Sequence, residues 1–386
     1  MENQLPPKKV PGFCSLRYGV SLLLHFCNGA IMTQRVCLSL TMVVMVNDTW
    51  GLTNVSSREN PGNIMGTIAT AQHHIWVRWA PPLERGRLTS ISVSGVMLGP
   101  FIVLLVTGLI CDLLGWPLVF YIFGVYGCVL CVFWFVLFYD DPKDHPYISI
   151  REKEYILSSL AQQDSSSSVT TLPIKAMLQS LPLWAISLCN FALLWTNNFV
   201  VTYTPTFINS VLHVDVKENG LLSSLPFLLS YIIGILGGYM GDFLLSRNIL
   251  STISVRKLFT ILGMFLPVVF NMCMLYLSFN FYSAIIFLIL AHSTSSFVLS
   301  GVFINVLDIA PRYYGFLRGT TSLIGMIGGI LSSTVSGLIL NEDPETSWYK
   351  IYFLMSSISV ITLIFYLIFA KAEIQDWAKE IQDTRL

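Results

Sequence analysis

The sequence predicts an all-α polytopic membrane protein, and three observations carry this prediction. Of the 386 residues, 54% are hydrophobic and 11% are charged, whereas soluble domains carry about 25% charged residues. Apolar runs of about 20 residues, enough to cross roughly 30 Å of hydrocarbon, recur along nearly the whole chain. Lys8, Lys9 and Arg17 precede the first run and predict a cytosolic N-terminus, residues 1–17. A soluble catalytic domain is excluded, and the net charge of zero argues against a nucleic-acid partner.

The first predicted span covers about residues 18–46, which is too long for the apolar core of a signal peptide. It emerges on the luminal or extracellular side, in a loop at about 47–63. This loop contains two glycosylation sequons, Asn-Asp-Thr at Asn47 and Asn-Val-Ser at Asn54. Charge and sequons agree, so we expect both asparagines to be glycosylated.

Nine further runs bring the predicted number of spans to about ten. They lie at about 64–80, which is short, 89–110, 117–138, 183–205, 219–240, 258–279, 281–306, 320–340 and 349–370. The polar segment 140–182 reads as an amphipathic helix followed by a serine-rich linker on the cytosolic side. It separates an N-terminal helical half, 18–139, from a C-terminal six-helix half, 183–371, which a cytosolic tail, 372–386, follows.

The two halves contain a repeated link between spans. Its counterparts are Ala80, Pro81, Arg85, Gly86 and Gly95 in the first half, and Ala310, Pro311, Arg318, Gly319 and Gly328 in the second. In each link a proline ends a helix, arginines stay on the cytosolic side, and small residues allow the next helix to pack closely. Parallel repeats of this kind are typical of transporters that rock about a central site.

The segment WAPPLERGRL, followed by SGVMLGPFI, resembles a link of major facilitator superfamily transporters, specifically of their anion:cation symporter family. The segments LPPKKVPGFCS, FYDDPKDHP, ENGLLSSLPFL and AEIQDWAKE resemble its renal type I sodium-phosphate subgroup. GGYMGDFLLSR resembles the superfamily's cytosolic loop signature, without its central basic residue and second glycine. The resemblance implies a major-facilitator-type two-bundle fold. Its cytosolic conformational links would contain Arg85, Arg87, Asp242, Arg247 and Arg318.

The same resemblance indicates a shortened N-terminal half. Four full spans precede APRYYGFLRG in the second half, but one full span and a short one precede APPLERG in the first. About two and a half helices are therefore missing, and the polar residues between Val46 and Gly66 are too few to cross a bilayer twice. Loss of two spans preserves the orientation of every later helix. The short run 64–80 either inserts with help from its neighbours or lies at the membrane interface.

Arg35 is the leading candidate for substrate contact and matches the first-helix arginine of the family. It lies about eleven residues from the luminal end of its span. A cation at this depth is costly and indicates a functional role, and an arginine without a counter-ion attracts anions. The alternative is a salt bridge or carbonyl contact between helices. Asn28, seven residues earlier, shares the face of Arg35.

Asn197, Asn198 and Tyr203 lie in the seventh-helix equivalent, where superfamily cavities carry polar and aromatic ligands. Amides in hydrocarbon need partners, so these residues either bind a substrate oxyanion or join two helices. His292 is expected to be structural. The cysteines are expected to be free thiols, and no metal site is predicted because metal ligands need a polar second shell.

The resemblance implies a secondary active transporter that works by alternating access. Its substrate would be inorganic phosphate coupled to sodium, or organic anions such as urate driven by membrane potential or chloride. The sequence shows no nucleophile–base constellation and no nucleotide loop, so we expect no enzyme activity and no cofactor other than the transported or modulating ions.

The alternative is a truncated family member that does not transport, is retained in the endoplasmic reticulum, or acts as an assembly or regulatory partner. The repeated links and the span count disfavour a receptor or channel. By resemblance, the protein belongs in the apical plasma membrane. Its tail ends with Thr384 and Leu386 in the positions that PDZ scaffolds recognise.

Overall fold

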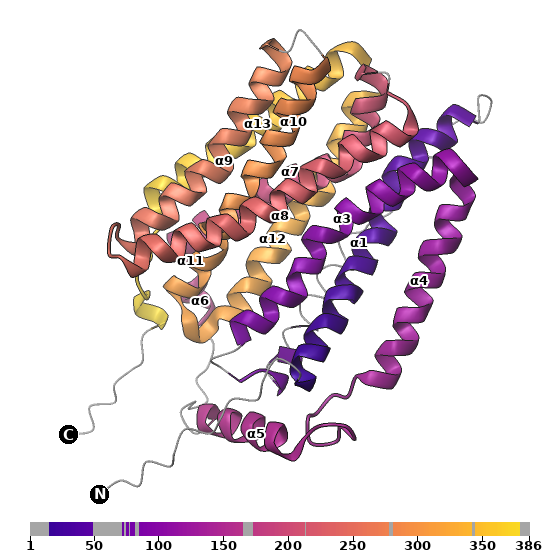
Figure 1. Ribbon diagram of the computed structural model, residues 1–386. Coiled ribbons are helices and arrows are strands. Elements are labelled where there is room, and N and C mark those ends of the chain that lie inside the picture. Colours follow the sequence, from indigo (N-terminus) through magenta and orange to yellow (C-terminus); the bar gives the residue numbers. More distant parts are fainter. Residues whose placement is uncertain are drawn as a thin grey trace, which may run out of the picture.

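The computed structural model describes residues 15–48, 72, 75–76, 78–81, 85–164, 173–212, 214–277, 281–341 and 344–378. These residues are almost entirely helical and contain no strand (Figure 1). The first half contains α1 (Leu16–Asp48), α3 (Arg85–Leu114) and α4 (Trp116–Leu137), followed by α5 (Ile150–Asp164) and α6 (Ile174–Leu178). The second half contains α7 (Leu181–Leu212), α8 (Val216–Ser246), α9 (Thr252–Leu277), α10 (Phe281–Ser295), η1 (Ser296–Leu299), α11 (Val302–Ile309), η2 (Pro311–Tyr313), α12 (Tyr314–Leu340), α13 (Pro344–Phe369) and η3 (Asp376–Ala378).

Eight stretches of the described chain are long and apolar enough to cross a membrane, with α10, η1 and α11 together forming one of them. Helices are the expected element because hydrocarbon offers no partner for an unpaired peptide group. The helix α1 has the length of a span but is less apolar than the eight, since it carries His25, Asn28 and Arg35. Nine of the ten predicted spans thus have a helix, and the tenth lies mostly outside the described residues.

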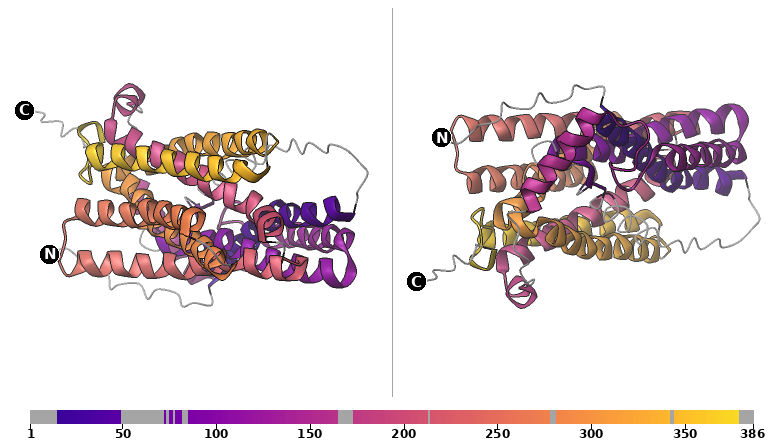
Figure 2. Two further views of the ribbon diagram at one scale, coloured as in Figure 1. Left: turned by 90° about the horizontal axis from the view of Figure 1, so that it is seen from above. Right: turned by 90° about the horizontal axis from the view of Figure 1, so that it is seen from below.

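The directions of the helices agree with the predicted parity. In Figure 1, α1 and α3 both begin at the end where α5 lies and run toward the opposite end. The views along the bundle in Figure 2 show α5 lying across that end. Glu152 of α5 accepts hydrogen bonds from the backbone N–H groups of Leu16, 3.0 Å, and Arg17, 3.1 Å. A carboxylate is favourable at this positive end of a helix, so the linker helix is fastened to the first half.

The repeated glycines have the same packing role in both halves. The most extensive helix contacts within the halves join α3 to α1 and α12 to α7. A Cβ atom on Gly95 would overlap the carbonyl oxygen of His25, and one on Gly328 would lie 2.5 Å from the carbonyl oxygen of Phe191. Each glycine therefore permits two helices to approach more closely than any side chain allows.

Three described residues of the predicted short span, Trp76, Trp79 and Ala80, are buried, whereas Arg78 is exposed. Trp76 and Trp79 are 2% and 0% exposed and pack in one cluster with Val20 and Leu88. The indole nitrogen of Trp79 donates to the carbonyl of Tyr139, 3.0 Å away. The two tryptophans therefore pack against the first half, and whether the segment crosses the membrane stays a prediction.

Two contacts join the halves. The helices α3 and α8 cross at Gly108 and Gly220, where an added Cβ on Gly220 would lie 2.8 Å from the Cα of Gly108. The helix α1 contacts α7 deeper in the molecule. Gly108 lies in the last third of α3, so this close crossing is far along the helix from its beginning at Arg85.

Candidate functional site

A cavity of about 1160 Å³, counting the part that is open to solvent, lies between the two halves. The helices α1 and α3 line it from the first half, and α7, α8, α9, α10, η1, α11 and α13 from the second. Most of its wall is apolar, as the residues Met32, Val96, Phe227, Met264 and Met355 illustrate. A position between two repeats is where transporters of this architecture place their binding site.

Among the described residues that line this cavity, Arg35 is the only lysine or arginine. Its guanidinium donates a hydrogen bond to Oδ1 of Asn198 on α7. No carboxylate pairs with it within the described part of the chain. Arg35 therefore brings a positive charge without a carboxylate partner to an apolar cavity. Its contact between helices is with the neutral amide of Asn198 and is not a salt bridge.

Asn198 and Tyr203 join α7 to α12. The Asn198 amide nitrogen donates to the Gly329 carbonyl, 2.8 Å, and to the Ser333 hydroxyl, 2.5 Å. The Tyr203 hydroxyl donates to the carbonyl of Ser333, 3.0 Å. The neighbouring Asn197 lines the cavity instead. Asn198 and Tyr203 thus join two helices, and substrate binding by Asn197 stays a prediction.

Asn28 lies away from the cavity lining. Its amide donates to the carbonyl of Ser92, 2.8 Å, and its oxygen accepts from Gln72, 2.5 Å. The side chain is 4% exposed. In this geometry Asn28 connects α1 to its neighbours in the first half.

The predicted links lie at the end of the molecule where α5 lies. Asp242 and Arg247 are exposed at the end of α8, and the Arg247 guanidinium lies 5.9 Å from the ring centre of Phe243. Arg318 stacks over the ring of Phe303 at 4.0 Å, and this ring lines the cavity. The side chains of Arg85, Arg87 and Asn47 and the residues Asn54, Thr384 and Leu386 lie outside what the structure describes.

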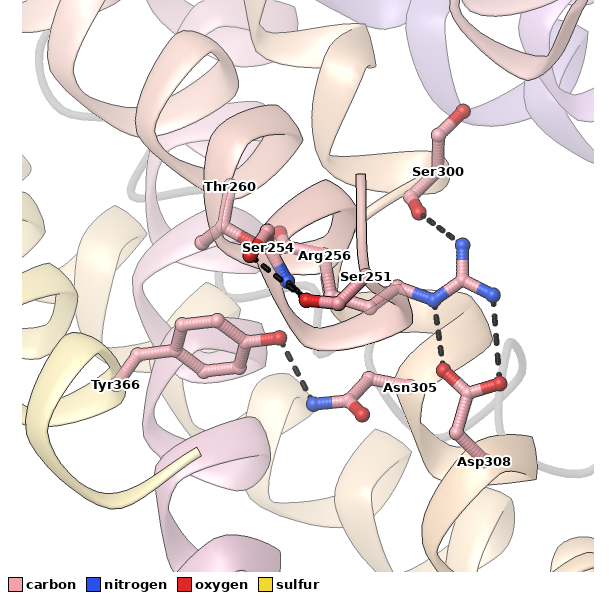
Figure 3. Close-up of polar contacts among 8 residues, drawn as sticks. All are labelled: Ser251, Ser254, Arg256, Thr260, Ser300, Asn305, Asp308 and Tyr366. Carbon is pink, nitrogen blue, oxygen red and sulfur yellow. Dashed lines mark hydrogen bonds and ion pairs between the residues drawn. The ribbon is translucent and has the colours of Figure 1, made fainter. Parts of the chain in front are cut away.

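Sequence reasoning missed a buried ion pair, which Figure 3 shows. Nε of Arg256 on α9 donates to Asp308 on α11 at 2.6 Å, and a second guanidinium nitrogen lies 3.3 Å from the other carboxylate oxygen. The third nitrogen donates to the carbonyl of Ser300, 3.0 Å away. Arg256 lies just before the predicted span 258–279, and Asp308 lies just after the span 281–306, on the same side of the membrane. This placement of opposite charges is the sequence signal that could have predicted the pair.

Comparison with known proteins decides the family. The sequence profile of the Major Facilitator Superfamily matches residues 62–333. The chain belongs to the major facilitator superfamily. It is therefore a multi-pass integral membrane protein of a transporter family, and the predicted resemblance and fold class are confirmed.

Three relatives within the superfamily cover nearly the whole chain. Sodium-dependent phosphate transport protein 1 of Mus musculus is 56% identical over 466 residues, covering 100% of both chains. Sodium-dependent phosphate transport protein 4 of Homo sapiens is 46% identical over 401 residues, covering 100% of this chain and 95% of that one. The probable small intestine urate exporter of Homo sapiens is 39% identical over 468 residues, covering 97% and 94%.

The alignment lengths show that this chain is shorter than some of its relatives, whereas the predicted place of the shortening, in the N-terminal half, stays a prediction. The mouse alignment spans 466 positions and this superfamily member has 386 residues, so 80 positions have no counterpart in it. The alignment with human protein 4 spans only 401 positions, so at most 15 have none. One named relative is therefore much longer than this chain in the aligned region, and another has nearly the same length.

Solved structures agree on the fold of this superfamily member. A bacterial homologue of the human lysosomal transporter Spinster, in an inward-facing and unoccupied conformation, superposes with a TM-score of 0.55 at 15% identity. The superposition covers 93% of this chain and 96% of that one. The fold is thus shared although the described first half has only three long helices, α1, α3 and α4.

Proposed function

We propose that this protein is a secondary active transporter that moves small anions across the membrane by alternating access about the central cavity. Its family and the names of its relatives, which are phosphate transport proteins and a urate exporter, support this function. The two halves would rock about an anion held between α1 and α7.

The observation that carries the proposal is Arg35. Within the described part of the chain it is the only lysine or arginine on the cavity wall, and its partner is an amide instead of a carboxylate. Two opposite unit charges 4 Å apart attract by about 4 kcal/mol at an effective dielectric constant of 20. An anion that enters the cavity therefore serves as the counter-ion that Arg35 lacks.

The apolar wall favours one substrate class. Inorganic phosphate is strongly hydrated and offers no apolar surface to Met32, Phe227 or Met264. An organic anion with one delocalised charge loses less hydration and buries its apolar body against the same side chains. Organic monoanions such as urate are the proposed preferred substrates, and sodium-coupled phosphate is the second candidate because relatives carry that name.

The proposed roles of the site residues follow from their contacts. Arg35 supplies charge, Asn197 supplies a polar group at the cavity surface, and Asn198 positions the guanidinium. Tyr203 and Asn28 hold helices in register. The link residues Arg85, Arg87, Asp242, Arg247 and Arg318 would move with the helices that they join.

Ion coupling is proposed from energetics. A potential of 100 mV, negative inside, opposes anion entry by about 2.3 kcal/mol per charge. Net uptake therefore needs co-transported sodium, whereas efflux needs no coupling. Sodium dependence in the names of the phosphate transport relatives supports sodium-coupled uptake. Chloride would modulate efflux.

The competing function is a truncated protein that does not transport. Human protein 4 speaks against it, because a relative of nearly the same length carries the name of a transport protein. Uptake of radiolabelled urate and phosphate into proteoliposomes, with sodium or choline outside, tests the proposal. Saturable uptake of either anion supports it, and absence of uptake by folded, correctly inserted protein contradicts it.

We also propose the apical plasma membrane as location, glycans on Asn47 and Asn54, and recognition of the tail by a PDZ scaffold. Digestion of the parent protein with a peptide N-glycosidase should increase its gel mobility. Without digestion, Asn47→Gln and Asn54→Gln should each produce about half of this increase. If neither variant changes mobility, the loop is either unmodified or on the cytosolic side.

A further inference from the structure

Two side chains in the wall of the central cavity each contain a buried polar atom that has no hydrogen-bond partner among the described residues. His292 on α10 and Ser356 on α13 line the cavity from the second half, and they are 7% and 6% exposed. Nδ1 of His292 and the hydroxyl of Ser356 have no partner among the described residues. A buried polar atom without a partner costs about 1–3 kcal/mol, so each calls for an explanation.

The backbone around His292 is held in place, while its ring is not anchored by hydrogen bonds through Nδ1. The His292 carbonyl accepts from the hydroxyls of Ser230, 3.3 Å, and Ser295, 2.6 Å. The ring meets Phe227 edge to face, with centroids 4.7 Å apart. Phenylalanine or leucine would fill this space without the cost of an unpaired nitrogen, so packing alone does not account for a histidine here.

The helix next to His292 changes form at the cavity. The hydroxyls of Ser293 and Thr294 donate to carbonyls four residues earlier, 2.5 Å and 2.7 Å away. Such bonds compete with the helical ladder, and α10 passes directly into the 3-10 segment η1. Asn271 of α9, 6% exposed, lines the same cavity and adds an amide to this wall.

We propose that His292, Ser356 and Asn271 form a neutral polar subsite that binds the hydrogen-bonding groups of an organic anion whose charge is held by Arg35. A neutral imidazole offers one donor and one acceptor, a hydroxyl offers both, and an amide offers both. The subsite therefore fits carbonyl and N–H groups on the body of the anion, and it deepens the proposed function on which it rests. Carboxylates with a purely apolar body would bind through Arg35 and the apolar wall alone.

The test compares two monoanions in purified wild type and variants. Urate carries carbonyl and N–H groups, whereas benzoate has an apolar ring. His292→Phe and Ser356→Ala should each raise the KM for urate about tenfold, the effect of one lost hydrogen bond, and leave the KM for benzoate within about twofold. Ser357→Ala is the matched control, because Ser357 lies on the same helix α13, donates to the carbonyl of Phe353, 2.8 Å away, and lies outside the cavity lining. It should change neither value.

Binding of both anions, measured as thermal stabilisation of the folded protein, separates the two levels of the proposal. If wild type binds and transports both anions while the His292 and Ser356 variants shift both KM values equally or neither, the subsite is refuted and the anion site at Arg35 stands. If folded wild type is stabilised by neither anion, the subsite is refuted, and the proposed function is refuted as well if the same protein takes up no phosphate.

Discussion

Replacing Arg35 with glutamine removes the positive charge from the cavity and keeps a side chain of similar polarity. Glutamine can still donate a hydrogen bond toward Asn198, so the contact between α1 and α7 is weakened less than the charge is changed. The variant therefore separates the two hypotheses for this residue, attraction of an anion and connection of two helices.

The expected magnitude follows from the electrostatics of the site. At an effective dielectric constant of 20, loss of one charge about 4 Å from an anion removes about 4 kcal/mol of attraction. Since about 1.4 kcal/mol corresponds to tenfold, affinity should fall about a thousandfold, and uptake at low substrate should reach background. A charge-assisted hydrogen bond contributes about 1.5–3 kcal/mol, so some loss of thermal stability is also expected.

The assay measures initial uptake of radiolabelled urate into proteoliposomes that contain equal amounts of folded protein. Arg35→Lys is the first control. It keeps the charge but not the planar fork of the guanidinium and should retain part of the uptake. Asn198→Ala is the second, because it removes the amide partner and keeps the charge, so binding should weaken only modestly.

The opposite ranking would refute the reasoning. One such result is a wild-type KM for Arg35→Gln, together with an equal loss of thermal stability in Arg35→Gln and Asn198→Ala. Arg35 would then connect helices and would not bind substrate. The anion site must then lie elsewhere in the cavity.

Three further predictions concern other parts of the molecule. Gly220→Val should abolish transport with normal membrane insertion, since its Cβ would meet the backbone of α3 at Leu104 and Gly108; unchanged turnover would show that this crossing does not need close contact. Asp308→Ala should lower the free energy of unfolding by about 3–5 kcal/mol because Arg256 stays buried without its partner, and thermal unfolding of the purified variant measures this. A ten-residue tail peptide should bind an apical PDZ scaffold with micromolar affinity, about −8 kcal/mol, in fluorescence polarisation; binding that survives Leu386→Ala would contradict recognition of the C-terminus.

The sequence by itself determined the class, the spans and the repeat. In hydrocarbon, a long apolar run can pair its backbone N–H and C=O groups within itself only as a helix. The predicted spans therefore agree with the helices to within a few residues at most boundaries. Gly95 and Gly328 were found as counterparts from spacing alone, and both lie where a helix approaches its neighbour too closely for a side chain.

The sequence also singled out Arg35, because a charge inside an apolar run is conspicuous at any position. It could not separate Asn197 from Asn198. The two are adjacent in the chain, but helix geometry turns consecutive side chains about 100° apart, so one lines the cavity and the other bonds to α12.

Only the tertiary structure decided which polar groups have partners. Arg256 and Asp308 are 52 residues apart and become a buried pair because α9 begins and α11 ends on the same side of one bundle. His292 appeared in the sequence as an ordinary structural histidine, since a lone polar residue carries no sign of what faces it. Whether its nitrogen is paired depends on the helices packed around it, and that packing leaves it unpaired at the wall of the cavity.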